Sequence, residues 1–309
     1  MEIETEGQNE SVIDSKETDN IKVEILQFDE LQGAKHPSVA QELYFARQIG
    51  LTMKRVKFTL EDASISIEPD ALHYMKGDLE LSSGTQEVGF LGLGRALWRQ
   101  MTVGETVFKT TIKGTGEVYL EPSFGHFLLQ ELDDEEIIAD QGIFAAGGGD
   151  IEVYSERIAK ISAMLFGGEG WFQTKVSGTG LVVFNSPVPL SEVVRVDLED
   201  EKLSVDGSFA ILRTGELEFV AETSSKSWIG SLTSGEGLLQ TFEGTGSVWL
   251  APTNSYYQGV EEQRVRRLEA QMAVRKAQTE LVSQVSSIKS STKKIAGEEE
   301  EENEEEEPE

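Results

Sequence analysis

The side chains that could do acid–base or metal chemistry are few and scattered along the chain. There are three histidines, His36, His73 and His126, and no cysteine. Protein metal sites place their ligands at short, recurring spacings, and these histidines follow no such pattern. The lack of cysteine excludes thiolate nucleophiles, thiolate metal sites and disulfides. A histidine beside an acid, at position 73 or 126, remains the one candidate general base.

Paired carboxylates are the other candidate acid–base groups. Gly-Asp-Leu-Glu at 77–80 recurs as Gly-Asp-Ile-Glu at 149–152 and as Gly-Glu-Leu-Glu at 215–218. Alternate residues of a strand share a face, so the two acids of each pair point the same way, commonly to solvent. One substrate needs one constellation of residues, whereas these pairs occur three times. We therefore predict no catalytic residue, no metal site and no cofactor.

A Gly-Thr-Gly box also occurs three times, and glycine-rich loops can hold phosphates. The boxes are Gly114-Thr115-Gly116, Gly178-Thr179-Gly180 and Gly244-Thr245-Gly246. A phosphate cradle needs a helix N-terminus directly after it. Alternating apolar residues typical of a strand follow instead. We interpret the box as a bend or bulge at the corner of a β-barrel.

A second glycine-rich segment, 89–101, is strongly apolar. Its Gly-x-x-Gly-x-Gly spacing differs from the dinucleotide-binding pattern, and it lies in no strand–turn–helix context. Two alternatives remain, namely contact with a neighbouring subunit and packing over the barrel mouth within the chain. The candidate interface residues are Phe90, Leu91, Leu93, Arg95 and Trp98.

The elements that carry these boxes are organised as a repeat. The carboxylate box, a Gly-Glu pair (104–105, 168–169 and 235–236) and the Gly-Thr-Gly box occur in this order three times. Self-similarity at a near-constant period indicates tandem duplication. The three expected homologous units are 55–121, 122–187 and 188–253.

Each unit is predicted to consist of strands. Apolar residues alternate with polar ones around the boxes, and Gly, Asp and Ser bound these runs, as in half-buried strands. Gln141-Gly142 and Asp206-Gly207 lie between apolar runs and predict tight hairpin turns. The predicted fold is mainly β, with three tandem units related by pseudo-threefold symmetry.

The segments outside the units have a different character. Residues 1–20 are acidic and lack an apolar period, so we expect them to be disordered. Residues 21–54 form a lead-in, with a strand at 21–28 and a short helix at 37–49 that has Pro37 in its first turn. The stripe of that helix comprises Ala40, Leu43, Tyr44 and Ala46.

The C-terminal segments are predicted to be a helix and a tail. Residues 260–296 contain no Gly or Pro, carry apolar residues at steps of three and four, and are net basic. Residues 297–309 are dominated by glutamate, and such a block is usually a disordered, solvated tail. The helix or the tail could contact a protein partner.

The charge of the chain limits its partners and its compartment. The formal net charge is −29. Binding to nucleic acid depends on Lys and Arg, as does binding to anionic membranes, so both are disfavoured outside the basic helix. No apolar run approaches the ~20 residues of a membrane span. An acidic N-terminus is unlike a signal or transit peptide, and with the lack of cysteine it favours a cytoplasmic location.

From about Ala71 to Thr253 the chain resembles the bacterial and organellar family named for altered inheritance of mitochondria, protein twenty-four. The matching features are the carboxylate boxes, the Gly-Glu pairs, the triple Gly-Thr-Gly and the closing segment 248–252. The resemblance implies a threefold duplication of a small β-unit, similar to the tryptophan RNA-binding attenuation protein and to double-stranded β-helix, or jelly-roll, folds. It also implies oligomers, with a trimer of nine units favoured. It brings no catalytic residue, and the inner-membrane role of mitochondrial members is not expected without a basic presequence.

Three functional hypotheses follow. The favoured one is a non-enzymatic, self-assembling β-scaffold or binding protein, because unpaired strand edges at both ends of the units are removed when copies close a ring. The first alternative is a jelly-roll that binds small molecules or carbohydrates, or an enzyme of that fold. The second is a ring-shaped RNA-binding protein, which requires a face rich in Lys and Arg.

Overall fold

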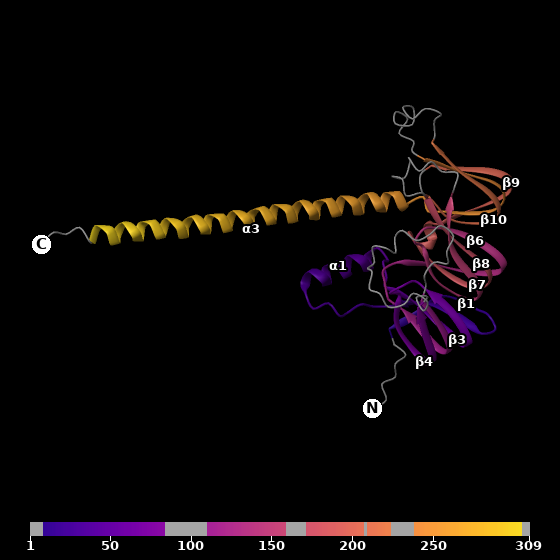
Figure 1. Ribbon diagram of the computed structural model, residues 1–309. Coiled ribbons are helices and arrows are strands. Elements are labelled where there is room, and N and C mark those ends of the chain that lie inside the picture. Colours follow the sequence, from indigo (N-terminus) through magenta and orange to yellow (C-terminus); the bar gives the residue numbers. More distant parts are fainter. Residues whose placement is uncertain (1–8, 84–109, 159–170, 207–208, 224–237, 305–309) are drawn as a thin grey trace, which may run out of the picture. The chain divides into compact units, whose positions relative to one another are not determined.

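The computed structural model describes residues 9–83, 110–158, 171–206, 209–223 and 238–304 (Figure 1). The chain divides into two compact units, Met1–Asn254 and Ser255–Glu309. The described strands lie in the first unit, and nearly all of the C-terminal helix forms the second. Each unit is therefore treated by itself.

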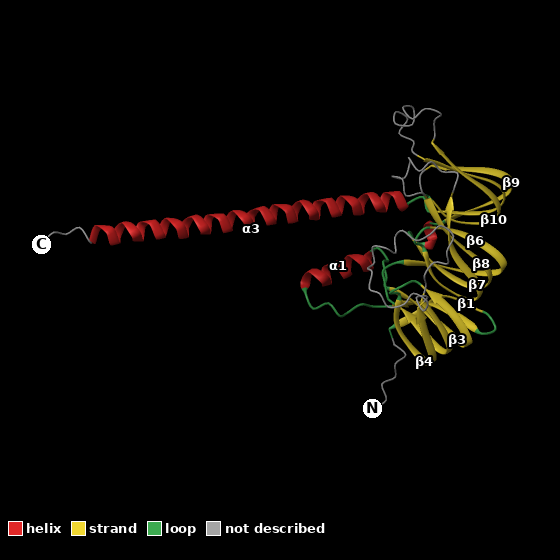
Figure 2. Ribbon diagram, in the orientation of Figure 1, coloured by secondary structure: helices red, strands yellow, loops and turns green. Residues whose placement is uncertain are grey.

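The described part of the first unit is mainly β, as predicted, and its strands form one large 11-stranded antiparallel sheet (Figure 2). The strands in chain order are β1 (Glu10–Glu17), β2 (Ile21–Phe28), β3 (Lys54–Ile67), β4 (Leu72–Ser83), β5 (Thr110–Leu120), β6 (His126–Asp140), β7 (Phe144–Ile158), β8 (Trp171–Ser186), β9 (Val194–Asp206), β10 (Ala210–Thr223) and β11 (Leu238–Leu250). Among the described residues, the helical elements are α1 (Pro37–Gln48), the short 3₁₀ helix η3 (Leu190–Glu192) and α3 (Asn254–Glu304).

The strands after the lead-in fall into three groups with the same internal order. They are β3-β5-β4, β6-β8-β7 and β9-β11-β10, so the strand with the Gly-Thr-Gly box lies between the other two. The turn at Gln141-Gly142 exists, with Gly142 at φ 83°. The prediction of a hairpin there is nevertheless wrong, because β6 and β7 pair with opposite edges of β8. Gly207 lies outside the described residues.

Short edge-to-edge pairings join successive groups. Residues 65–67 of β3 pair with 146–148 of β7, and residues 137–139 of β6 pair with 212–214 of β10. In order of pairing, the described strands run from β1 at one end of the sheet to β9 at the other, and these two end strands do not pair with each other, so the sheet is open. This differs from the predicted jelly-roll, which divides its strands between two sheets. The physical reason is that the groups meet through strand edges, so pairing continues from one group to the next.

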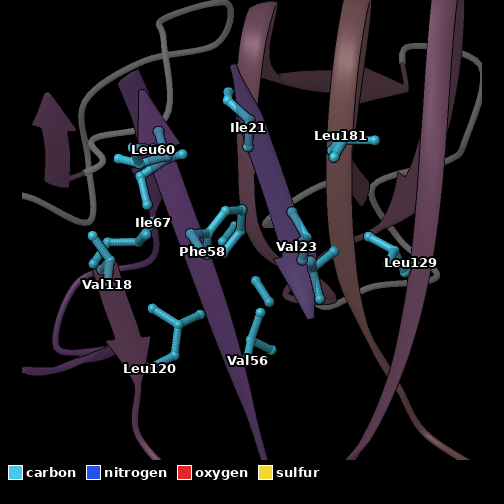
Figure 3. Packing of buried hydrophobic residues seen from close by; sticks show 14 of the residues in the cluster. Ile21, Val23, Val56, Phe58, Leu60, Ile67, Val118, Leu120, Leu129 and Leu181 are labelled. Atoms are coloured by element: carbon cyan, nitrogen blue, oxygen red, sulfur yellow. The ribbon is translucent and has the colours of Figure 1, made fainter. Parts of the chain in front are cut away.

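The core follows the predicted two-residue period. Along β3, buried Val56, Phe58 and Leu60 alternate with less buried residues. The first apolar cluster joins β2, β3 and β5 to residues of β6, β7 and β8. In Figure 3, Val23 of β2 stands between Phe58 of β3 and Leu129 of β6. A second cluster joins β6–β8 to β10 and β11, and a third comprises only residues of the last group.

The lead-in is more ordered than its sequence predicts. Residues 10–17 form β1, which pairs with β2, so the expected disorder of 1–20 is wrong for this part. Backbone pairing does not require apolar side chains, and Arg55 binds Glu10 of β1 at 2.7 Å. The strand at 21–28 and the helix at Pro37–Gln48 are confirmed. No residue of α1 is buried, so its apolar stripe is not part of the core.

The second unit is helical, as predicted, but α3 is longer than expected. It begins at Asn254 and continues to Glu304, so the predicted disorder is wrong for residues 297–304. Glutamate is a good helix former, which explains how a helix extends into an acidic block. Among the described residues, no helix is both long and apolar enough to cross a membrane.

Candidate functional site

The threonine of each Gly-Thr-Gly box accepts a hydrogen bond from the backbone amide of an aspartate. Thr115 Oγ1 accepts from Asp62 at 2.9 Å, Thr179 from Asp134 at 3.0 Å and Thr245 from Asp200 at 3.1 Å. The three threonines thus have equivalent partners. Asp62, Asp134 and Asp200 have φ values of 49°, 54° and 56°.

These aspartates mark a bulge in the first strand of each group. In chain order, the first strand of each group pairs with the third: β3 with β5, β6 with β8 and β9 with β11. The register of this pairing shifts at Leu60/Ala63, at Leu132/Glu135 and, in the last group, at Gly244/Gly246. Aspartate is among the few residues that adopt a positive φ readily. The threonine hydroxyl therefore satisfies an amide that the bulge removes from the strand ladder. The sequence signal that was missed is an acidic residue followed by Asp, at 61–62, 133–134 and 199–200.

The glycines of the box allow two backbones to approach closely. A Cβ added to Gly178, which has φ +119°, would lie 2.1 Å from the carbonyl oxygen of Asp150. Gly114 and Gly244 face the carbonyls of Asp78 and Glu216 in the same way, at 2.1 and 2.3 Å. The box lies inside a strand and no helix begins there, so its glycines serve strand packing. The predicted barrel corner is replaced by a bulge in the neighbouring strand.

The repeated carboxylates lie on the solvent side, as the alternation predicts. Asp78, Glu80, Asp150 and Glu152 are all exposed. Within the described ranges, no group of three or more His, Asp or Glu side chains is close enough to hold a metal ion.

The three histidines lie in separate parts of the chain. His36 precedes α1, and its Nδ1 accepts a hydrogen bond from the Ser38 amide at 3.2 Å. His73 is exposed on β4, edge-on to Tyr74 at a ring distance of 5.3 Å. His126 opens β6, where burial and the charge of Lys54 lower its pKa. The structure brings none of the three together.

A small cavity lies where the first two groups meet. Its volume is about 250 Å³, and three of its lining residues are the acids Glu68, Asp70 and Glu121. The other lining residues are Pro69, Ala71, Leu120, Ser123, Phe127, Ala145 and Asn185. The cavity is smaller than most ligand pockets. No histidine lines it.

A buried cation was not predicted from the sequence. The guanidinium of Arg55 binds Glu10 at 2.7 Å and lies 4.6 Å from the ring centroid of Tyr119. The rings of Phe28 and Tyr74 are at 5.5 and 5.6 Å. Burial disfavours the charge of Arg55, but Glu10 and Tyr74 outweigh it and raise the pKa. The cage of aromatic rings is therefore filled by a side chain of the protein itself.

At one equivalent position the two outer groups have a cation–aromatic pair where the middle group has an apolar pair; the cation–aromatic contact of the middle group, Lys175 with the Tyr154 ring at 5.8 Å, lies elsewhere. Lys57 is 5.5 Å from the Tyr119 ring, and Arg195 is 4.9 Å from the Trp249 ring. In each outer group, the cation and the aromatic residue are opposite each other in two paired strands. The equivalent opposed residues of the middle group are Leu129 and Val183. Leu129 and Val183 are buried in the first cluster. The pair is thus polar in the two end groups and apolar in the middle one.

The interface candidates of the 89–101 segment, Phe90, Leu91, Leu93, Arg95 and Trp98, lie outside the described residues. Their predicted role stays a prediction.

Comparison with known proteins finds relatives of this chain in sequence and in structure. An uncharacterised protein of Streptococcus pyogenes serotype M6 is 26% identical over 198 residues, which cover 62% of this chain and 77% of that protein. An X-ray crystal structure of a Streptococcus pyogenes protein matches with a TM-score of 0.53 and 22% identity, over 70% of this chain and 94% of that one. At this identity the likeness concerns the fold alone. The family model for mitochondrial biogenesis AIM24 matches residues 47–253, which confirms the resemblance stated above. The chain belongs to the mitochondrial biogenesis AIM24 family.

Proposed function

We propose that this chain is a non-enzymatic, self-assembling β-scaffold built from three tandem copies of one small β-unit. The observation that carries the proposal is the recurrence of one arrangement in all three strand groups. Each group has the same strand order and the same threonine–aspartate hydrogen bond. A pseudo-threefold relation between the units accounts for this recurrence.

The non-enzymatic part of the proposal rests on what the repeated residues do. The Thr hydroxyls bind backbone amides and the glycines admit neighbouring carbonyls, so these residues maintain the strands. The histidines lie before α1, in β4 and in β6, and none of them lines the cavity between the first two groups. A catalytic constellation needs a nucleophile, a base and an orienting group within hydrogen-bond reach.

The self-assembling part rests on how the groups already join. Each junction within the chain is a strand edge added to a strand edge, and such a contact can be repeated between copies of the chain. With three units per chain, a trimer of nine units is the favoured assembly. The helix α3 exposes Val265, Leu268 and Met272, which suits an additional contact with a protein partner.

Light scattering coupled to size exclusion tests this proposal. At micromolar concentration we expect one discrete species whose mass is a multiple of 34.1 kDa, with three copies favoured. A clean monomer over this range would contradict self-assembly.

Binding of a small polar molecule is a second candidate, favoured by the acidic cavity. Glu68, Asp70 and Glu121 could accept hydrogen bonds from hydroxyl or amino groups of a sugar. A thermal-shift screen with monosaccharides and amino sugars tests it, with Glu121→Gln as the matched variant. Stabilisation of the original chain that is lost in the variant would support this candidate. The net negative charge does not favour the RNA-binding alternative.

A further inference from the structure

We propose that copies of this chain associate head to tail, with β9 of one copy pairing antiparallel to β4 of the next. In the proposed register, Ser204 of one copy stands opposite Met75 of its neighbour. This inference rests on the self-assembly proposed above and names the surfaces that carry it.

The two junctions inside the chain supply the template. At the first, Ile65 of β3 stands opposite Gly148 of β7. At the second, Ile137 of β6 stands opposite Thr214 of β10. Each junction comprises three residue pairs. Counted in chain order, the first strand of one group (β3 or β6) pairs with the second strand of the following group (β7 or β10). A single rule therefore describes both junctions.

The same rule selects residues in the two strands at the ends of the row. Ile65 and Ile137 each lie three residues after the aspartate of the bulge, and in the last group that position is Leu203. Gly148 and Thr214 directly precede the glycine of the carboxylate box, and in the first group that position is Lys76. The rule therefore places Leu203 opposite Lys76, and its next two steps place Ser204 opposite Met75 and Val205 opposite Tyr74.

Both selected edges lack a second partner among the described residues. There β9 pairs only with β11, and β4 pairs only with β5, whereas β7 and β10 each pair on both edges. Figure 1 labels β9 and β4 at opposite ends of the strands of the first unit. The β4 edge of one copy is therefore available to the β9 edge of another. Unpaired edges of this kind are a template for a further strand.

The apolar clusters agree with a missing neighbour at β9. At the first junction, Ile65 and Ile67 share a cluster with Ala145 and Ala146 of the following group. At the second, Ile137 and Ala139 share a cluster with Ile211 and Leu212. These two apolar residues of the first strand thus have a neighbour from the next group at both junctions.

The third cluster has no such contribution. Of the residues that the structure describes, it contains four buried ones, Leu198, Val205, Phe242 and Val248, and Leu203 is partly buried. The approaching strand β4 offers Tyr74, which occupies the place of Ala146 and Leu212 and is 40% exposed, and Met75, which is 38% exposed. Pairing of β4 with β9 would remove apolar surface from water on both strands.

The two edges differ, so the contact is heterologous. Such a contact closes into a ring when the rotation between copies allows it and otherwise continues as a filament. Each junction then leaves no unpaired edge between copies.

Cysteine cross-linking tests the register directly, because the natural chain contains no cysteine. Full-length Ser204→Cys and Met75→Cys variants are mixed and oxidised mildly, and the products are separated without reductant. Both positions are exposed, so the substitutions should preserve the fold, which circular dichroism checks. We expect a covalent dimer that forms only when both variants are present.

The matched control mixes Ser204→Cys with Leu81→Cys. Leu81 is also exposed on β4, but lies six residues further along, about 20 Å away along the strand. We expect at least about tenfold less dimer from this pair, because opposed residues in a strand pair lie within disulfide distance and displaced ones do not. Equal yields from both pairs would overturn the register.

The other outcomes separate this inference from the proposed function. Absence of the Ser204–Met75 cross-link in a chain that light scattering shows to be oligomeric would overturn the β4–β9 contact and leave self-assembly intact. A monomer by light scattering would overturn both.

Discussion

At the scale of single residues, the threonine between the two glycines is the most informative position. A valine there would have the same β-branched shape and the same strand propensity. Only the hydroxyl can accept the hydrogen bond from the aspartate amide, which is 3.0 Å away in the middle group. The combination of Thr with flanking Gly is thus explained by two different needs, an acceptor for the bulge and space for the neighbouring carbonyl.

The first prediction concerns this hydroxyl. Thr179→Val should lower the free energy of unfolding by about 1 kcal/mol, the usual net value of one hydrogen bond, because the Asp134 amide loses its acceptor. Thr179→Ser keeps an acceptor and should lose less. Urea denaturation checks both variants. A stability unchanged in Thr179→Val would show that water replaces the hydroxyl at no cost.

The second prediction concerns the ion pair of Glu117 with Lys57, whose charged atoms are 2.7 Å apart. The hydrogen bond from Lys57 lowers the pKa of Glu117. A lowered pKa means that the ionised form stabilises the fold at pH values above the unfolded pKa, about 4.3, and that this stabilisation disappears as the pH falls through the folded pKa. Glu117→Gln should therefore be less stable than the original chain at pH 7, by at most about 1 kcal/mol, and equally stable in strong acid.

Denaturation curves at a series of pH values measure this difference. Glu80→Gln, at an exposed position of β4, is the matched control and should leave the stability unchanged at pH 7. A Glu117→Gln deficit that persists at low pH would assign the effect to lost packing and not to charge.

At the scale of elements, the sequence predicted what local patterns determine. The alternation along β3, the strand at 21–28 and the Pro-initiated helix α1 are all visible in short windows and are confirmed. Pairing partners depend on segments distant in sequence. The turn at Gln141-Gly142 was therefore found, while the insertion of β8 between β6 and β7 was not.

The same reasoning explains the missed strand β1. Its sequence is polar, so an argument based on apolar burial predicts no structure, yet its backbone pairs with β2 over most of its length. The contact with Arg55 could not be predicted either, because Glu10 and Arg55 lie in strands separated by β2 in the sheet.

The third prediction tests how this ion pair ties β1 to β3. The side chains of Arg55 and Glu10 are only 12% and 11% exposed. Glu10→Ala leaves the buried guanidinium without its carboxylate and should cost about 3 kcal/mol of unfolding free energy. The double variant Glu10→Met, Arg55→Met should recover a large part of this loss.

The reason for the recovery is that the pair is incompletely bonded. Glu10 Oε1 and Arg55 Nε are buried without a hydrogen-bond partner, so two apolar side chains remove both penalties. Thermal denaturation of the single and double variants measures the coupling. Additive losses in the double variant would contradict the role assigned to the ion pair.

At the scale of the whole molecule, the chain combines two units with different stabilisation. The β-unit has three apolar clusters, the first of which joins its lead-in to two strand groups. The helical unit exposes its apolar residues from Val260 to Leu281, and none of those described is buried. Family membership extends over residues 47–253, which lie within the β-unit. The helix is an addition to the part that the family shares.

The fourth prediction follows from this division. A chain that ends at Gln258 keeps every described strand, and it also keeps Asn254, whose amide donates to the carbonyl of Ala251. Because no described residue beyond Ala251 belongs to the apolar clusters, we expect its thermal denaturation midpoint to stay within about 2 °C of that of the full chain. We also expect its oligomeric mass by light scattering to keep the same number of copies, because the proposed β4–β9 contact lies in the β-unit. Loss of the oligomer with an unchanged midpoint would assign self-assembly to α3, since the fold would be intact while the contact between copies was gone.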